Sequence, residues 1–318
     1  MIFVTVGTQL PFDRLVKAMD RWAADHPDQK VIVQSAEGDY QPQHMHCEPY
    51  MAPDRYAEVL ARCSQVVAHA GTGSILSAQE LGKPLLIMPR DPKLREVRSD
   101  HQHSTAGKYA RRAGILIAWE TEDLATQLDA LLTMALDGDL GEAEGAEAQG
   151  LNNAIAEFVE QAPLRVKDAP CHRVVCACST GGHFVEMQRM LSALEGHELI
   201  VMTSDSKDAS SVPAGRHFAI REASRWSKSK GFSTFLQLMF LIPRLRADVV
   251  LSTGAAPGFL AVMMGRLTGS RVIWVDSLAN VDRVSLGGRL ARVFAHQFLV
   301  QWSDLADGRR TQYRGRVR

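Results

Sequence analysis

The sequence contains no long apolar run and no excess of charge of either sign. Among its 318 residues, no uninterrupted apolar stretch reaches the roughly 20 residues that a membrane-spanning helix needs. Basic and acidic residues number 36 each, so the composition indicates no bulk attraction to nucleic acid. Met1 leads directly into the apolar IFVTV without a basic segment, so we expect no secretory signal. These absences predict a cytoplasmic protein. The length leaves room for two domains of ordinary size.

Cysteine is scarce as well, with five residues in the chain. Without a secretory signal, reduced thiols are the simplest interpretation of this odd number. Cys176 and Cys178 lie two apart in the strand-like HRVVCAC, so their side chains face the same side of a sheet. A metal site would need more ligands nearby than the sequence offers there. We therefore expect these thiols to pack in a core.

The most informative stretch is VVAHAGTGSILSAQELGKP, which starts at Val66. Its first apolar residues predict the end of a buried strand, residues 69–74 a glycine-rich turn, and Ile75–Leu81 a helix. This order directs backbone N–H groups and the positive end of a helix dipole at one point, which suits a diphosphate. Such a turn can also bind nothing. A binding site is favoured by three polar residues after the next predicted strand: Asp100, His101 and Gln102.

The chain divides at DGDLGEAEGAEAQG, residues 137–150, which is acidic, punctuated by glycine and nearly free of large apolar residues. This composition is typical of a linker. A helix is predicted over Leu151–Gln161 from its apolar spacing. We therefore predict a first domain over residues 1–136, a linker with a helix over residues 137–170, and a second domain over residues 171–318.

The pattern of strand, glycine turn and helix returns in the second domain. Apolar residues 174–178 precede a turn at residues 179–183, and Phe184, Met187 and Met190 form one face of the helix that follows. Further strands are predicted in LIVMTSD, ADVVLST, RVIWVDS and HQFLVQW. Strands that alternate with helices predict the α/β class with doubly wound parallel sheets, and ligands then bind beyond the carboxyl ends of the strands.

Motifs in both halves resemble the GT-B glycosyltransferases related to MurG. In the first half, MIFVTVGTQLPFDRLV and HAGTGS are similar to the small catalytic subunit of the eukaryotic dolichol-linked GlcNAc transferase, and more so to the bacterial exopolysaccharide subunit PssE. In the second half, STGGH, LSTGAAPG, WVDSLANV and VQWSDLAD resemble the membrane-associating subunit of that enzyme and bacterial PssD. The resemblance covers residues 1–135 and 171–307. It implies a natural fusion with the donor-binding domain first, the reverse of the MurG order.

This resemblance implies an inverting, metal-independent GT-B enzyme with two Rossmann-like domains. It would move a hexosyl or hexuronosyl unit from a UDP-sugar to a polyprenyl-diphosphate-linked sugar, at the cytoplasmic face of the membrane, in exopolysaccharide assembly. No cofactor and no nucleic acid is expected, and other polysaccharide-assembly proteins are the expected partners. The alternatives are a module that binds nucleotide-sugar or lipid without transfer, and a glycosyltransferase of a soluble small molecule. Intact glycine turns in both halves favour an enzyme.

For the donor, we expect the leaving diphosphate to be stabilised by backbone N–H groups of two loops that precede helices. His69 either belongs to this site or only orients its loop, and Gln102 and His101 are expected to bind sugar hydroxyls. Many GT-B donor sites carry a ribose-binding glutamate where this sequence has Ser77. The predicted donor-binding residues are Gly7, Thr8, Gln9, His69, Gly71, Thr72, Gly73, Ser74, Ser77, His101 and Gln102.

The acceptor hydroxyl must lose a proton to a general base. His183 is the first candidate because an imidazole titrates near neutrality, although it can instead contact phosphate or cap its turn. Asp276 is the second candidate, with a helix N-cap as its alternative role. The resemblance further implies acceptor binding by Ser179, Thr180, Gly181, Gly182, Gly254, Pro257, Gly258 and Ser277.

Two segments that contain or adjoin several cations can each be interpreted in two ways. Residues 232–242 are strongly apolar and have cations on both sides, which is typical of a segment at a membrane interface. A core helix with solvated ends, terminated or kinked at Pro243, is the alternative. The second segment, residues 90–98, carries four cations that either pair with the carboxylate of a uronate sugar or are solvated: Arg90, Lys93, Arg95 and Arg98.

Overall fold

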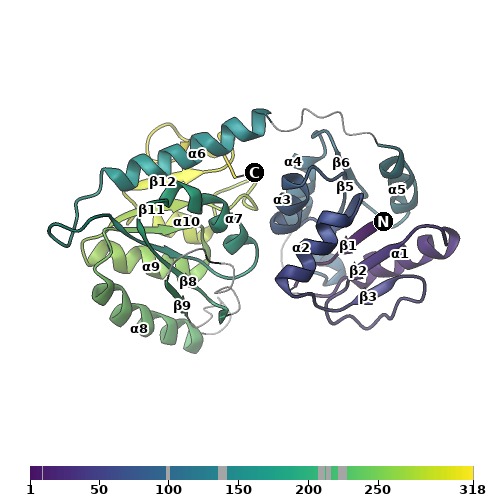
Figure 1. The fold of residues 1–318 in the computed structure, drawn as a ribbon, viewed down its shortest axis with the longest axis horizontal. Helices are drawn as coiled ribbons and strands as arrows, with labels where there is room; N and C mark the ends of the chain where they lie inside the picture. The colour runs from purple at the N-terminus through teal and green to yellow at the C-terminus, as the bar shows by residue number, and fades with distance from the viewer. Residues whose placement is uncertain are drawn as a thin grey trace. The chain divides into compact units, whose positions relative to one another are not determined.

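The computed structural model describes residues 1–8, 10–97, 101–134, 142–206, 212, 216–220 and 228–317. Within these ranges, residues 142–144 and 228–232 are described by their backbone alone. The chain forms two compact units, Met1–Ala143 and Glu144–Arg318. Each unit is an α/β layer structure in its own right (Figure 1).

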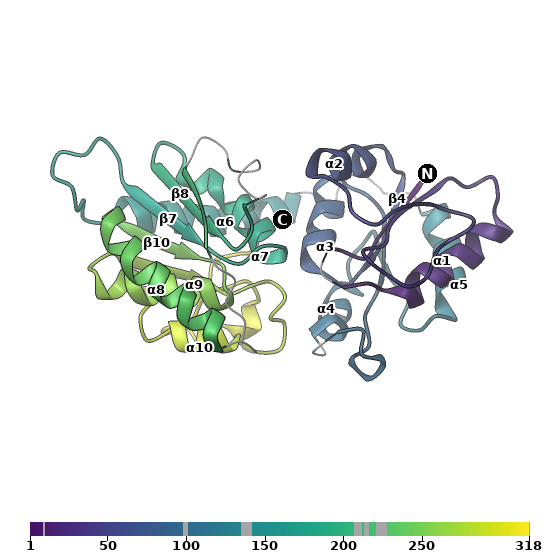
Figure 2. The same cartoon turned by 90° about the horizontal axis from the view of Figure 1, so that it is seen from below.

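The first unit is built on a six-stranded parallel sheet in the order β3-β2-β1-β4-β5-β6. Its strands are β1 (Ile2–Thr5), β2 (Val31–Gln34), β3 (His46–Glu48), β4 (Gln65–His69), β5 (Leu85–Met88) and β6 (Ile115–Ile117). Helices cover both faces (Figures 1 and 2): α1 (Asp13–Asp25) and α5 (Asp123–Thr133) on one, and α2 (Pro53–Arg62), α3 (Thr72–Glu80) and α4 (His101–Tyr109) on the other. This is the Rossmann order, with the switch point between β1 and β4.

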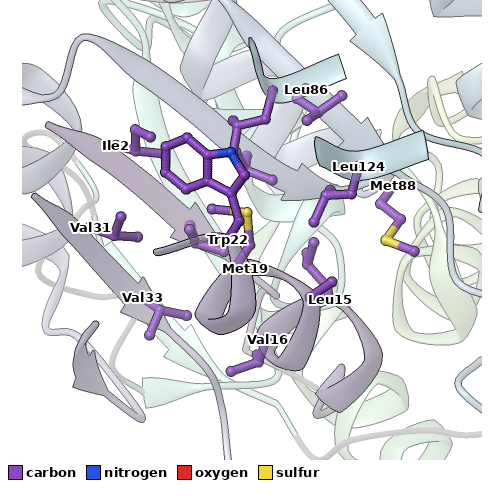
Figure 3. Close-up of a cluster of buried hydrophobic side chains, with 14 of the residues drawn as sticks. Ile2, Leu15, Val16, Met19, Trp22, Val31, Val33, Leu86, Met88 and Leu124 are labelled. Atoms are coloured by element: carbon purple, nitrogen blue, oxygen red, sulfur yellow. The ribbon is translucent and has the colours of Figure 1, made fainter. Parts of the chain in front are cut away.

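Alternation along the strands divides the core of this unit into two layers. Ile2 and Leu86 point from the sheet toward Leu15 and Trp22 of α1 and Leu124 of α5, and all five are buried (Figure 3). Phe3 points to the opposite face because successive side chains of a strand alternate. Burial on both faces explains why these strands are continuous apolar runs in the sequence.

The second unit repeats this design with a seven-stranded parallel sheet in the order β13-β12-β11-β10-β7-β8-β9. Its strands are β7 (Arg173–Ala177), β8 (Glu198–Thr203), β9 (Arg216–Ala219), β10 (Val249–Ser252), β11 (Arg271–Val275), β12 (Gln297–Val300) and β13 (Gln312–Tyr313). Helices α8 (Lys228–Leu245), α9 (Ala255–Leu267) and α10 (Leu286–Ala291) cover one face, and α6 (Glu142–Glu160) and α7 (Gly182–Met190) the other (Figures 1 and 2). The switch point lies between β7 and β10. The predicted α/β class with two Rossmann-like sheets is thus confirmed.

The predicted linker is helical over much of its length, which corrects the sequence interpretation. Helix α6 begins at Glu142 rather than at Leu151, so residues 142–150 of the acidic stretch belong to it. Glutamate and alanine are strong helix formers, and tertiary contacts hold these turns in place. The Tyr313 hydroxyl donates to Glu147 at 2.8 Å, and Gly150 lies against the backbone of Arg314. The helix therefore packs on the second unit.

The apolar segment at residues 232–242 lies within α8, and one face of this helix is part of the core. Leu238 and Ile242 are fully buried against the sheet, which agrees with the alternative of a core helix for this face of the segment. Phe240, in contrast, is 56% exposed. Pro243 does not end the helix, which continues to Leu245. None of the helices over the described residues has the length and apolar composition to cross a membrane.

The cysteines are free, as expected. Cys176 and Cys178 are buried in the second unit without a disulfide, and no group of three or more potential metal ligands is found over the described ranges.

Candidate functional site

In the first unit, the loops after β1 and β4 meet at the switch point of the sheet. Gly71 is the N-cap of α3, and no side chain caps this helix. The N–H groups of Thr72, Gly73 and Ser74 form its first turn, where a helix offers donors without intrahelical partners. The Gly7 N–H donates to Thr5 Oγ1 at 3.2 Å and the Gly71 N–H to the His69 carbonyl at 2.8 Å. The N–H groups of Gly7 and Gly71 are thus already engaged within the protein, and the first turn of α3 offers the donors that can bind an anion.

The His69 ring packs between Gly7 and Gly71, one from each loop. A Cβ atom on Gly71 would lie 2.1 Å from His69 Nε2, and one on Gly7 would lie 2.7 Å from Cε1. Burial, with the charge of Arg90, lowers the pKa of His69 to about 3. The imidazole is therefore neutral at any physiological pH. It acts as a spacer that sets the distance between the loops, and its buried Nδ1 has no hydrogen bond to the described residues.

Arg90 follows β5 at the same edge and is buried, with 3% of its surface exposed. Its Nη2 donates to the Val6 carbonyl at 2.8 Å and also to the Leu10 carbonyl, and its guanidinium lies over the Phe12 ring at 5.2 Å. Burial lowers the pKa of Arg90 to about 10, so it stays charged at neutral pH. Arg90 thus holds the loop between β1 and α1 and is not free to clamp a uronate.

The other predicted donor residues take different positions. Gln102 accepts a hydrogen bond from the Arg90 N–H at 3.1 Å through its side-chain oxygen. Thr8 and His101 are exposed and Ser77 is half-buried. Ser74 is buried, and its hydroxyl is bonded to the Tyr56 hydroxyl. Gln9 and Asp100, together with Arg98, lie outside the described residues.

A polar network that could not be predicted from the sequence supports the loops after β1 and β4. Thr5 Oγ1 donates to Gln34 Oε1 at 2.8 Å and accepts from the Gly7 N–H. Tyr56 of α2 bonds to Thr5 and Ser74, and burial raises its pKa to about 12, so it remains a neutral phenol. These residues come from β1, β2 and α2, and no local motif links them.

In the second unit, two helices begin at the switch point with glycine N-caps. Gly181 precedes α7 with φ of 76°, and Gly254 precedes α9 with φ of 131°. Both values lie in the left-handed region that favours glycine, and neither helix has a side-chain cap. Thr180 donates through its N–H to Ser204 Oγ at 3.3 Å, and Ser179 bonds to the Thr180 carbonyl. Two open helix N-termini at one edge suit a second diphosphate.

His183 connects these two helix starts. Its Nδ1 lies 2.9 Å from the Thr253 carbonyl, while Thr253 Oγ1 donates to the His183 carbonyl at 2.8 Å. A carbonyl only accepts, so the ring proton sits on Nδ1 and Nε2 carries the lone pair. Burial lowers the pKa of His183, opposed by the Thr253 contact and by the charge of Asp276. Among the described residues, no hydrogen bond to Nε2 is found, and a neutral imidazole with an available Nε2 has the form that a general base requires.

Asp276, the second predicted base, is enclosed by protein. It is 1% exposed, and its carboxylate accepts from Trp274 Nε1 at 3.0 Å, Ser285 Oγ at 2.6 Å and the Ser285 N–H at 3.0 Å. It is not an N-cap either, since Ser285 caps α10 through the Gly288 N–H. This geometry gives Asp276 no direct path to a substrate. Its charge acts on His183 instead.

Three predicted acceptor residues are also buried. Pro257 and Gly258 face the sheet, and a Cβ atom on Gly258 would lie 2.1 Å from Ser252 Oγ. Ser277 is 4% exposed and donates its hydroxyl to Glu186 at 2.6 Å. Glu186 itself was missed, although an acid beside Phe184 and Met187 on the apolar face of a helix is a visible signal.

Comparisons with known proteins match two different families to the two parts of the chain. The model of the family "Glycosyltransferase family 28 C-terminal domain" matches residues 1–165, and that of "Oligosaccharide biosynthesis protein Alg14 like" matches residues 212–317. The UDP-N-acetylglucosamine transferase subunit ALG14 of Cryptococcus neoformans var. neoformans serotype D (strain B-3501A) is 28% identical over 193 residues, covering 49% of this chain and 84% of that protein. The Mus musculus subunit ALG14 is 25% identical over 191 residues, covering 49% and 87%. The crystal structure of Acinetobacter baumannii MurG is similar with a TM-score of 0.38 and 13% identity over 46% of each chain.

Proposed function

We propose a specific transfer reaction on the premise that this chain belongs to the family described by the glycosyltransferase family 28 C-terminal domain. The reaction moves a hexosyl or hexuronosyl unit from a UDP-sugar to a polyprenyl-diphosphate-linked saccharide, with inversion and without a metal ion. The first unit binds the donor and the second binds the acceptor. Exopolysaccharide assembly at the cytoplasmic face of the membrane is the process that we propose for it.

The observation that carries this proposal is the neutral His183 with its proton fixed on Nδ1, at the start of an open helix. Nε2 takes the proton of the acceptor hydroxyl as the oxygen attacks the anomeric carbon from the face opposite UDP. The bond to the UDP oxygen breaks in the same step, so the configuration inverts. The first-turn amides of α3 stabilise the charge that develops on the leaving diphosphate. Those of α7 and α9 hold the diphosphate of the acceptor.

The experiment that tests this function is a donor and acceptor screen with the purified chain. UDP-GlcNAc, UDP-glucose and UDP-glucuronate are each offered with a short polyprenyl-diphosphate-linked sugar, and the product is analysed by mass spectrometry. The ALG14 relatives make UDP-GlcNAc one natural donor to include. Since Arg90 is sequestered, selectivity for glucuronate would rest on the exposed Lys93 and Arg95. Release of UDP without a glycosylated product would refute the proposed transfer.

Activity is expected to survive EDTA. The charge of the leaving diphosphate is assigned to the first-turn N–H groups of α3, which are fixed in place and need no cation to act. Initial rates of UDP release, measured with and without chelator, check this assignment. Loss of activity in EDTA that Mg²⁺ or Mn²⁺ restores would contradict it.

We further propose that the outer surface of α9 and α10 contacts the membrane. Leu286, Leu290 and Val293 follow a helical spacing and are 41%, 48% and 78% exposed. Leu267 at the end of the neighbouring α9 is 67% exposed. Helices α8, α9 and α10 pack side by side (Figure 2), so Phe240 of α8 adds to the same face of the unit. Arg244, Arg266 and Arg289 carry positive charge on these helices, which suits anionic headgroups.

Replacing both Leu290 and Val293 with serine is expected to weaken binding to vesicles of anionic lipid by about tenfold or more, since apolar area contributes about 25 cal/mol per Å² on transfer. Co-sedimentation over a lipid titration measures this change, and binding of the unchanged chain should fall as salt rises. Leu81→Ser is the matched control because Leu81 is 45% exposed but lies in the first unit. Equal losses in both variants would assign the membrane contact elsewhere.

A further inference from the structure

We infer that Glu186 is a positioning residue of the acceptor site, which holds the first turns of α7 against the ends of β11 and β12. This inference rests on the proposed transfer reaction and names a residue that keeps its base in place. Glu186 cannot touch a substrate itself, because its side chain is fully buried.

The Glu186 carboxylate receives three hydrogen bonds from two other segments. Oε1 accepts from Ser277 Oγ at 2.6 Å, and Oε2 accepts from the Leu278 N–H at 3.1 Å and from Gln301 Nε2 at 2.7 Å. Ser277 and Leu278 follow β11, and Gln301 follows β12. One side chain of α7 therefore fixes the helix to the carboxyl ends of two strands.

The partners of Glu186 extend this connection. Gln301 Nε2 also lies 3.2 Å from the Asp276 carbonyl, and Gln301 Oε1 accepts from the Val317 N–H at 2.9 Å. Ser277 Oγ, which donates to Glu186, accepts from the Ala279 N–H at 3.2 Å. The turn that starts at Asp276 is thus held from both sides, by Ser285 on the Asp276 carboxylate and by Glu186 one residue later.

This turn matters to His183 because Asp276 supplies the charge that favours its protonated form. His183 and Glu186 lie three residues apart, within one turn of α7. Without the Glu186 contacts, α7 and the Asp276 turn would each be free to shift. The distance between imidazole and carboxylate, and the aim of Nε2 at the acceptor hydroxyl, would then vary.

A role in packing alone does not account for a carboxylate at this point. Burial raises the pKa of Glu186 to about 7 although three donors oppose the shift. A charge without solvent contact destabilises a fold relative to an apolar side chain of similar volume, so its presence in this core fits a geometric task.

The test compares Glu186→Ala with Glu186→Gln in the full chain. Glutamine can accept from Leu278 and Gln301 through its oxygen and donate to Ser277 Oγ, so it keeps all three contacts without the charge. We expect Glu186→Ala to lower kcat by about 10–100-fold with an unchanged KM for the UDP-sugar, since a displacement of about 1 Å at a reacting group can cost that much. Glu186→Gln should restore most of kcat. Glu157→Ala is the control, because Glu157 is exposed on α6 of the same unit.

Two measurements test the inference without relying on catalytic activity. Hydrogen exchange of the Leu278 amide should speed up in Glu186→Ala and stay slow in Glu186→Gln. The His183 imidazole, followed by NMR, should titrate at lower pH in Glu186→Ala because Asp276 is no longer held nearby. If the unchanged chain transfers no sugar, the proposed function fails and these readouts still judge the inference.

Either of two results would overturn it. The first is a Glu186→Ala variant that keeps full kcat or an unshifted His183 titration. The second is a Glu186→Gln variant as inactive as Glu186→Ala while Leu278 stays protected, which would assign the effect to the charge rather than to position.

Discussion

Replacing His183 with alanine is expected to lower kcat for sugar transfer by about 10²–10⁴-fold, the range typical of general acid–base catalysis. The Thr253 carbonyl fixes the proton on Nδ1, so Nε2 is the one ring atom that can accept the proton of the acceptor hydroxyl. Burial keeps the imidazole neutral near pH 7. Steady-state kinetics with saturating donor and acceptor measure the loss.

The affinity for UDP should remain unchanged in this variant, since the proposed donor contacts lie in the first unit. His46→Ala is a suitable control because its side chain is 59% exposed and distant in sequence from both switch points. Turnover close to that of the unchanged chain would remove His183 from the role of base. Asp276 would then become the candidate, and its enclosure by Trp274 and Ser285 would have to open during the reaction.

Replacing Glu186 with glutamine is expected to make the stability of the protein less dependent on pH. Between acid and neutral pH, the free energy of unfolding of the variant should rise by about 3 kcal/mol relative to that of the unchanged chain, which corresponds to a pKa shift of Glu186 from 4.5 to about 7. The sign follows from proton binding. The folded state holds the Glu186 proton more tightly than the unfolded state does. The contribution of Glu186 to the free energy of unfolding of the unchanged chain therefore falls as pH rises from about 4.5 to about 7. The variant shows no such fall because glutamine does not titrate.

Urea unfolding of both proteins in parallel, at several pH values across this window, measures the difference. Subtracting the two curves cancels the titrating groups that the substitution leaves unchanged. A difference that is independent of pH would mean that Glu186 titrates near its ordinary value in the folded protein.

The strands that position both sites could be predicted from the sequence. Strands β4, β7, β10 and β11 are buried on both faces, so each is an unbroken apolar run followed by a glycine or polar turn. The parallel arrangement follows from their alternation with helices. Strand β3 is short and partly exposed, and it gives no such signal.

The predictions that failed depend on contacts between residues far apart in the chain. Helix α6 extends into the acidic stretch because Glu147 meets Tyr313 from the other end of the chain. Leu238 is buried because α8 packs on the sheet, whereas its apolar composition alone also fits a membrane interface. Asp276 stands at the predicted edge, but Trp274 and Ser285 enclose its carboxylate, and no local pattern shows this.

The close fit of His69 against Gly7 and Gly71 has a consequence for how this protein can change by mutation. Gly71 has an ordinary φ of −89°, so its backbone would accept alanine, and the obstacle is the imidazole 2.1 Å from the new methyl group. The same substitution is therefore harmful beside histidine and tolerable beside a smaller residue at position 69. Gly7 is different because its φ of 77° disfavours a side chain whatever its neighbours. Positions 69 and 71 thus form an epistatic pair, and an evolutionary path that places a side chain at position 71 has to change the histidine first.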